Sequence, residues 1–202
     1  MDGRQGETLT KLFQVETVLD SAADMEGPVQ VLDLGTGSGC LMLSILAKLS
    51  QSVGTGLDIS QPALDVARLN ASRLGLDNRC TFVQGSWAGE ASLLKQQCYD
   101  IIVCNPPYVS TAELQACDDE VREWEPYAAL FGGDDGLDEY RSVLPVIARV
   151  LRPVLGVAAL ELPGGEEDAA NVANIAESAK LRVVDIKSDY SHRPRVLLLK
   201  SS

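Results

Sequence analysis

Two consecutive prolines stand in the most distinctive segment of the sequence, Asn105-Pro106-Pro107-Tyr108. Proline has a fixed φ angle and no backbone N–H, so the carbonyl groups around this pair lack local donors and can point outward. The side-chain oxygen of Asn105 and the carbonyl oxygen of Pro106 can then accept both hydrogens of a planar –NH₂ group. Tyr108 can cover the flat face of that group. The segment, here called the diproline loop, predicts a site for a carboxamide or a ring amine.

Such a nitrogen is a poor nucleophile because its lone pair is delocalised. Holding both hydrogens aims the nitrogen at an electrophile and favours the loss of planarity that methyl transfer requires. The methylated nitrogen is acidic and can lose a proton to water, so the reaction needs no general base. A rigid turn without a ligand is the alternative interpretation of this segment.

A second cluster indicates a cofactor. The turn Gly35-Thr36-Gly37-Ser38-Gly39 follows an apolar run and precedes a helical pattern, where glycines let a ligand approach the backbone closely. Asp58 ends the next apolar run, where an acid can accept hydrogen bonds from both ribose hydroxyls. Trp87 follows a third run, and its ring can stack on adenine. A ligand-free strand–helix junction, a capping role for Asp58 and ordinary packing of Trp87 are the alternatives.

These two clusters together select the cofactor. The glycine turn and Asp58 fit either a nicotinamide dinucleotide or S-adenosylmethionine, since both contain adenosine. A hydride-transfer enzyme has no use for a loop that grips an –NH₂ group. The diproline loop therefore favours S-adenosylmethionine, and no metal is required.

Short apolar runs alternate with helical patterns along the chain. We expect strands at residues 29–34, 52–58, 80–84, 99–104, 154–162, 181–186 and 195–200, and helices at residues 41–49, 61–74, 137–151 and 166–179. This alternation predicts an α/β fold: a doubly wound, mostly parallel, seven-stranded Rossmann-like sheet. The last two strands have no helix between them, so one should be antiparallel and close the sheet. Ligands of such sheets lie beyond the carboxyl ends of the strands, where the candidate residues cluster.

The composition limits the function classes. The chain has 202 residues, 46% of them apolar, and a formal net charge of −12 with pI near 4.5. The acidic balance argues against direct nucleic-acid binding through phosphate neutralisation and leaves room for a basic protein partner. The five cysteines form no C-x-x-C pair and are expected to be reduced in an intracellular protein. No signal peptide or membrane-spanning stretch is expected, so we predict a cytoplasmic location, with an organelle as the alternative if the N-terminus is truncated.

Longer blocks carry a family resemblance. The block at 123–141, which contains Glu-Pro, Ala-Leu, Gly-Gly, Asp-Gly-Leu and Tyr-Arg, resembles a segment of the HemK/PrmC family of peptide-chain release factor glutamine N5-methyltransferases. Leu160-Glu161-Leu162 is similar to a strand end of that family, and residues 189–196 are similar to its closing hairpin. With the diproline loop, these blocks resemble class I S-adenosylmethionine-dependent methyltransferases from about residue 29 to residue 200.

The resemblance implies roles for particular residues. Residues 35–39 would line S-adenosylmethionine, Asp58 would hold its ribose, Trp87 would meet its adenine, and Asn105 would contact both cofactor and substrate. Asn105, Pro106, Pro107 and Tyr108, together with Glu125, would bind the glutamine of a release factor's Gly-Gly-Gln loop. A small activator protein is a further partner within the family. An exocyclic amine of nucleic acid as substrate, or a catalytically weakened binding module, are the alternative functions.

Two departures from the family affect the expected organisation. Family members usually carry an N-terminal helical domain, whereas we expect residues 1–28 to be a short helical remnant and residues 29–202 to be the catalytic domain. Ser86 stands where the family has an acid before the tryptophan, which removes one acceptor for the adenine amino group.

Overall fold

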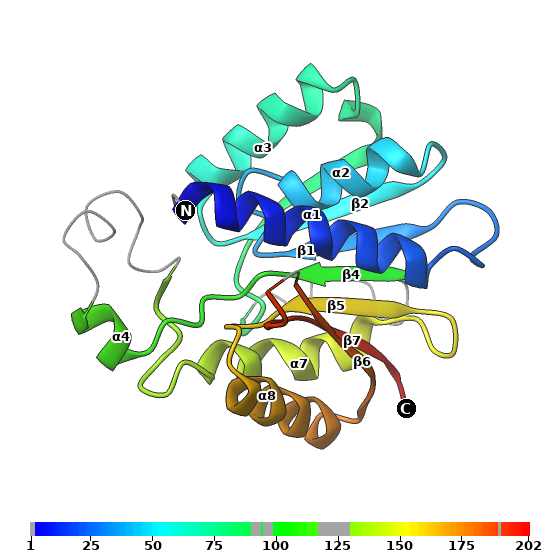
Figure 1. Ribbon diagram of the computed structural model, residues 1–202. Helices are drawn as coiled ribbons and strands as arrows, with labels where there is room; N and C mark the ends of the chain where they lie inside the picture. Colours follow the sequence, from blue (N-terminus) through cyan, green and yellow to red (C-terminus); the bar gives the residue numbers. More distant parts are fainter. Residues whose placement is uncertain (1–2, 90–93, 95–98, 117–129, 190) are drawn as a thin grey trace.

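Seven strands form a sheet in the order β3-β2-β1-β4-β5-β7-β6 (Figure 1). The computed structural model describes residues 3–89, 94, 99–116, 130–189 and 191–202. The strands are β1 (Gln30–Leu34), β2 (Val53–Asp58), β3 (Cys80–Gln84), β4 (Ile101–Cys104), β5 (Val157–Glu161), β6 (Leu181–Ser188) and β7 (Pro194–Ser201). Strands β1 to β5 pair in parallel, and β7 is antiparallel to both β5 and β6. The predicted α/β fold class, including its closing antiparallel strand, is confirmed.

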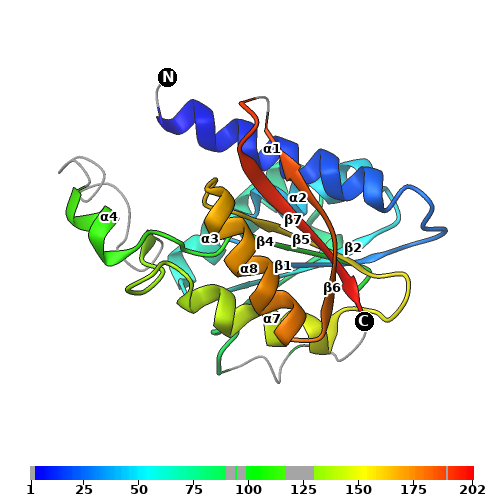
Figure 2. The same ribbon diagram turned by 60° about the horizontal axis from the view of Figure 1, so that its bottom comes forward.

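Helices cover both faces of the sheet. Helices α1 (Gly3–Ser21), α2 (Cys40–Lys48) and α3 (Gln61–Arg73) lie along one face, and α7 (Asp138–Val150) and α8 (Glu166–Ser178) lie along the other (Figures 1 and 2). No helix within the described residues is long and apolar enough to cross a membrane.

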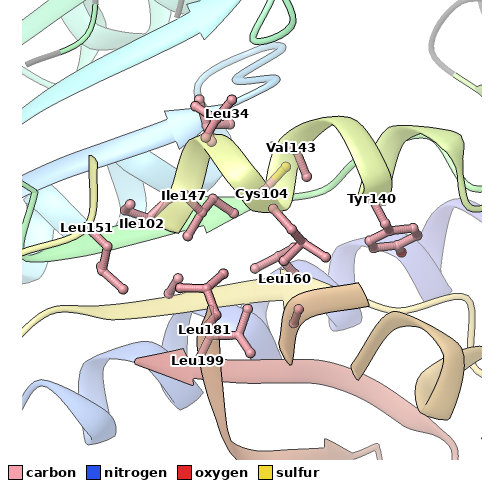
Figure 3. Close-up of a cluster of buried hydrophobic side chains, with 14 of the residues drawn as sticks. Leu34, Ile102, Cys104, Tyr140, Val143, Ile147, Leu151, Leu160, Leu181 and Leu199 are labelled. Atoms are coloured by element: carbon pink, nitrogen blue, oxygen red, sulfur yellow. The ribbon is translucent and has the colours of Figure 1, made fainter. Parts of the chain in front are cut away.

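Strand β4 is apolar at every position because both of its faces are buried. In β4, Ile101 and Val103 belong to the core packed against α1 and α2, whereas Ile102 and Cys104 belong to the core on the other face. Side chains alternate across a strand, so a central strand that is covered on both faces needs apolar residues at every position. Figure 3 shows the core on the α7 side, where residues of α7 gather with Ile102, Cys104 and Leu160 of the sheet.

Strand β5 begins later than the sequence pattern predicts. Residues 153–156 form a turn in which Leu155 N donates to Pro153 O at 2.8 Å. Val154 has a φ angle of 69° there, and its side chain is 81% exposed. The apolar residues Val154 and Leu155 therefore lengthen the apolar run of the sequence, but they lie in the turn and not in the strand. The short helix α4 (Thr111–Ala116) and the 3-10 turn η1 (Asp77–Arg79) were not predicted.

The parallel arrangement brings the carboxyl ends of β1 to β5 to one edge of the sheet. The glycine turn follows β1, Asp58 ends β2, and the diproline loop follows β4 at this edge. Helix α4 and the N-terminal end of α1 lie on the same side of the molecule (Figure 1).

Candidate active site

The glycine-rich turn joins β1 to α2 and is fixed to the end of β2. Gly35, Gly37 and Gly39 have φ angles of 72°, 53° and 82°, a region that other residues rarely adopt. The backbone N–H groups of Gly35 and Thr36 both donate to the carbonyl oxygen of Leu57, at 2.9 and 3.0 Å. The turn therefore has one defined shape at the carboxyl edge.

Asp58 holds the same turn from the side. Its Oδ2 accepts from Gly37 N at 2.8 Å, and its Oδ1 accepts from Ser60 N at 2.9 Å. An ionised carboxylate offers about four lone-pair sites, so each oxygen keeps capacity for another donor. Asp58 is half-buried and can serve two purposes, shaping the turn and accepting from a ligand hydroxyl.

Two other residues of the turn have packing roles. Ser38 is exposed, and its carbonyl oxygen accepts from Asn70 Nδ2 at 3.0 Å. A Cβ atom built on Gly39 would lie only 2.9 Å from Leu43 Cδ1 and 3.3 Å from the Ala67 Cβ. Gly39 thus lets α2 start close to α3, whatever its part in ligand binding.

A buried acid, to which the sequence analysis gave no role, supports the turn from beneath. Asp33 is 1% exposed, and its Oδ2 accepts from Thr36 Oγ1 at 2.8 Å and from Met42 N at 3.3 Å. Its Oδ1 has no hydrogen-bond partner within the described residues. Burial raises the pKa of Asp33 from 3.8 to about 6, and Thr36 and Met42 oppose that shift through their hydrogen bonds. The Thr36 hydroxyl therefore points into the protein. An acid two residues before the glycine turn was the available signal in the sequence.

Residues from the cofactor side and the substrate side of the predicted site meet at Gly35. A Cβ atom built there would lie 3.2 Å from Cζ3 of Trp87 and 3.9 Å from the carbonyl oxygen of Asn105. The Trp87 indole N–H donates to Glu139 Oε2 at 3.0 Å, so a residue in the first turn of α7 orients this ring. Stacking of Trp87 on adenine stays a prediction. Glu139 was missed because nothing near it in the sequence points to Trp87.

The diproline loop leaves β4 with Pro106 buried and Asn105, Pro107 and Tyr108 half-buried. A neighbouring segment holds its far end. Val109 N donates to Leu130 O at 2.9 Å, and Gly132 N donates to Val109 O at 3.0 Å.

Two glycines allow this segment to pack directly on the loop backbone. A Cβ atom built on Gly132 would lie 2.7 Å from Tyr108 Cα and 2.9 Å from Pro107 O. One built on Gly136 would lie 2.5 Å from Tyr108 O. These glycines belong to the block that carries the family resemblance, and the structure gives their physical purpose.

A cavity of about 140 Å³ opens beside Tyr108. It is lined by Tyr108, Ser110, Glu113, Asp135, Gly136, Leu137, Pro163 and Asp168. Arg141 forms an ion pair with Asp135 at 2.6 Å and lowers the pKa of that acid to about 2. Glu113 Oε2 accepts from Ser110 N at 2.9 Å. Glu125, the remaining predicted substrate residue, lies outside the described residues.

Solved structures share this fold at low sequence identity. A methyltransferase from Pyrococcus furiosus superposes with a TM-score of 0.67 at 21% identity, covering 96% of this chain and 83% of its own. TrmN from Thermus thermophilus superposes with a TM-score of 0.64 at 21% identity, covering 93% of this chain and 48% of its own. These likenesses support the class I methyltransferase fold alone.

Sequence relatives are much closer. Residues 26–162 match the family model described as a methyltransferase domain. The release factor glutamine methyltransferase of Rhodospirillum rubrum is 39% identical over 96% of this chain, which spans 58% of the length of that relative. The enzyme of the same name from Agrobacterium fabrum is 37% identical, with 96% of this chain and 67% of the relative covered. The chain therefore belongs to the methyltransferase domain family and, within it, to the family of the release factor glutamine methyltransferases.

Proposed function

We propose that this chain transfers a methyl group from S-adenosylmethionine to the side-chain amide nitrogen of a glutamine, in the Gly-Gly-Gln loop of a peptide-chain release factor. One observation carries the proposal: the glycine turn and the diproline loop meet, with Gly35 beside both Trp87 and the carbonyl oxygen of Asn105. The names of the relatives support the substrate.

The residues at the glycine turn fit this cofactor. A Cβ atom built on Gly37 would meet nothing within 4 Å in the part of the chain that the structure describes, so the space over the turn is open to a ligand there. Asp58 keeps lone pairs for the ribose hydroxyls, and the half-buried Trp87 lies next to Gly35. S-adenosylmethionine supplies a methyl group on a positively charged sulfur.

The diproline loop acts on the substrate amide. The Asn105 side-chain oxygen and the Pro106 carbonyl oxygen each accept one amide hydrogen, which aims the nitrogen lone pair at the methyl donor. Tyr108 covers the amide plane. The two acceptors also stabilise the pyramidal, partly positive nitrogen of the transition state more than the planar amide. Such preferential stabilisation of the transition state accelerates a reaction.

The cavity beside Tyr108 is the place for the residues next to the glutamine. Glu113 and Asp168 line it together with the ion-paired Asp135, and the whole chain carries a net charge of −12. These charges favour a basic substrate protein. They disfavour nucleic acid, whose backbone is itself negative.

The test is methylation of an intact release factor by the full chain with labelled S-adenosylmethionine. We expect one added methyl group by intact mass, mapped to the glutamine of the Gly-Gly-Gln loop, and no label when that glutamine is replaced by alanine. Asn105→Ala should abolish transfer while the dissociation constant of the cofactor changes little, because it removes an acceptor that faces the substrate.

Four other results would contradict parts of the proposal. A folded, cofactor-binding chain that leaves the factor unlabelled removes the substrate assignment, and label on DNA or RNA amines replaces it with the nucleic-acid alternative. A chain that fails to bind the cofactor is a binding module instead. Label that appears only when a second small protein is added places the chain among activator-dependent enzymes.

A further inference from the structure

Gln14 is a buried amide on α1 whose partners are far away in the sequence. Its side chain is 0% exposed, and its Nε2 donates to the carbonyl oxygens of Cys104 at 3.1 Å and Ala159 at 2.8 Å. Cys104 ends β4, Ala159 lies within β5, and the two strands pair side by side. One amide group therefore connects α1 to the seam between these strands.

The carbonyl of Cys104 is half of the peptide group that leads into Asn105. The two residues after Asn105 are prolines, which have no backbone N–H with which to anchor the loop. A peptide group is planar, so a hydrogen bond to its carbonyl oxygen fixes the orientation of the whole group. The direction in which the chain leaves β4, and with it the position of Asn105, is set at this carbonyl.

Although Gln14 makes two hydrogen bonds, the other half of its amide group is unfavourable for stability. Its Oε1 is buried and has no hydrogen-bond partner within the described residues, and an unpartnered buried acceptor destabilises a fold. Val15 and Val18 on the same helix are buried apolar residues of the adjoining core. A methionine could occupy the space of Gln14 without leaving an orphaned acceptor. A polar residue that breaks the local rule is typical of positions that serve function.

We propose that Gln14 is a positioning residue that holds the diproline loop in its working orientation through the Cys104–Asn105 peptide. This inference rests on the proposed methyl transfer and adds to it a part for α1. Gln14 acts through the backbone, so its loss should lower the rate of transfer more than it lowers the affinity for the cofactor.

Gln14→Met tests this proposal, because it keeps the side-chain volume while removing both hydrogen bonds and the orphaned acceptor. Val18→Ala is the matched control, since it loosens the same buried face of α1 without touching a strand carbonyl. For each full-length variant we would measure four quantities: the thermal midpoint, the dissociation constant of S-adenosylmethionine, kcat on a release factor, and amide hydrogen exchange in the peptide covering residues 105–114.

For Gln14→Met we expect kcat to fall about tenfold or more, since small misplacements of reacting groups cost such factors. Exchange in the 105–114 peptide should be faster, with an unchanged or raised thermal midpoint and a cofactor dissociation constant within about twofold of wild type. Val18→Ala should lower the midpoint and keep kcat near wild type.

An unchanged kcat in Gln14→Met overturns the proposal, and so does an equal loss of kcat in Val18→Ala. If the wild-type chain methylates no release factor, the proposed function fails separately, and hydrogen exchange then decides the inference. Faster exchange in the loop supports the anchoring role of Gln14, and unchanged exchange overturns it.

Discussion

Asp58 illustrates how one side chain in this site can do two things. Its oxygens accept from Gly37 in the glycine turn and from Ser60 at the start of α3, yet an ionised carboxylate has room for two more donors. Ribose binding and capping are alternative interpretations of this residue in the sequence. The geometry makes them compatible, so a substitution must be designed to separate them.

We expect Asp58→Ala to raise the dissociation constant of S-adenosylmethionine by about 10- to 100-fold, because a hydrogen bond to a charged group contributes about 1.5–3 kcal/mol. Titration calorimetry measures this constant. Ser60→Ala is the control, since it removes the cap that Ser60 Oγ provides to Ala63 N at 3.3 Å and leaves the carboxylate intact. Equal affinity losses in both variants would show that the loss follows from a general disturbance at the start of α3 and not from the missing carboxylate.

Asp33 should make the free energy of unfolding depend on pH. Burial raises the pKa of Asp33 to about 6, above the 3.8 of an exposed aspartate. Between these two pH values, the folded chain therefore keeps a proton on Asp33 that the unfolded chain has released. The unfolding free energy should therefore decrease as pH rises from about 4 to about 6, by up to about 3 kcal/mol, and this loss persists at higher pH.

Asp33→Asn should remove this pH dependence, because an amide oxygen can still accept from Thr36 and Met42 without carrying a charge. We expect the variant to be more stable than wild type at pH 7.5 by about 1–2 kcal/mol, with little difference at pH 4.5, in urea denaturation. A variant that is less stable than wild type by the same amount at both pH values would show that the charge is well accommodated.

Among the elements, those with a local signal could be predicted from the sequence. The parallel strands follow from apolar runs such as the one that ends in Cys104, and the turn at Gly35 follows from glycine chemistry. Contacts between distant segments carry no local signal. Gln14 bonds to residues 90 and 145 positions away, and Glu139 bonds to Trp87 across 52 positions. The predicted site residues of β1, β2 and β4 converge because parallel strands share an edge, whereas the side chains that support them had to be seen in the structure.

The segment that packs on the diproline loop gives an element-scale prediction. Gly132→Ala would place a Cβ atom 2.7 Å from Tyr108 Cα and 2.9 Å from Pro107 O. These are backbone atoms that cannot rotate away, so the loop or the segment must shift. We expect the single-turnover rate of methyl transfer to fall about tenfold or more, with cofactor affinity unchanged within about twofold.

Gly89→Ala is the control for this change, since a Cβ atom built there meets none of the described residues within 4 Å and no positive φ angle is involved. Both variants add one methyl group in place of a glycine hydrogen, so they differ only in what that methyl group meets. A Gly132→Ala variant as active as Gly89→Ala would mean that the loop tolerates displacement. The geometry of the amide acceptors would then matter less than we propose.

At the scale of the whole molecule, the negative charge stabilises the ends of two helices and should also attract a basic substrate protein. Helix α8 begins after β5 with Glu166, Glu167 and Asp168 in its first turn, and α7 likewise begins with Asp138 and Glu139. Acids in a first helical turn stabilise the helix through its dipole. Both helices start near the edge where the parallel strands end, so the same residues make that edge negative. A basic substrate protein would be attracted to it before any specific contact forms.

This attraction predicts that salt weakens the binding of the substrate protein and leaves the rate of methyl transfer unchanged. The KM for an intact release factor should rise about threefold or more between about 0.05 and 0.3 M salt, where the screening length falls below about 10 Å, while kcat stays constant. Glu166→Gln combined with Glu167→Gln should reduce that slope. Glu177→Gln, at the opposite end of α8, should leave it unchanged. A short uncharged peptide carrying the target glutamine should show a flat KM. A KM that falls with salt for the intact factor would instead indicate docking through apolar surface, because salt strengthens apolar contacts and weakens charged ones.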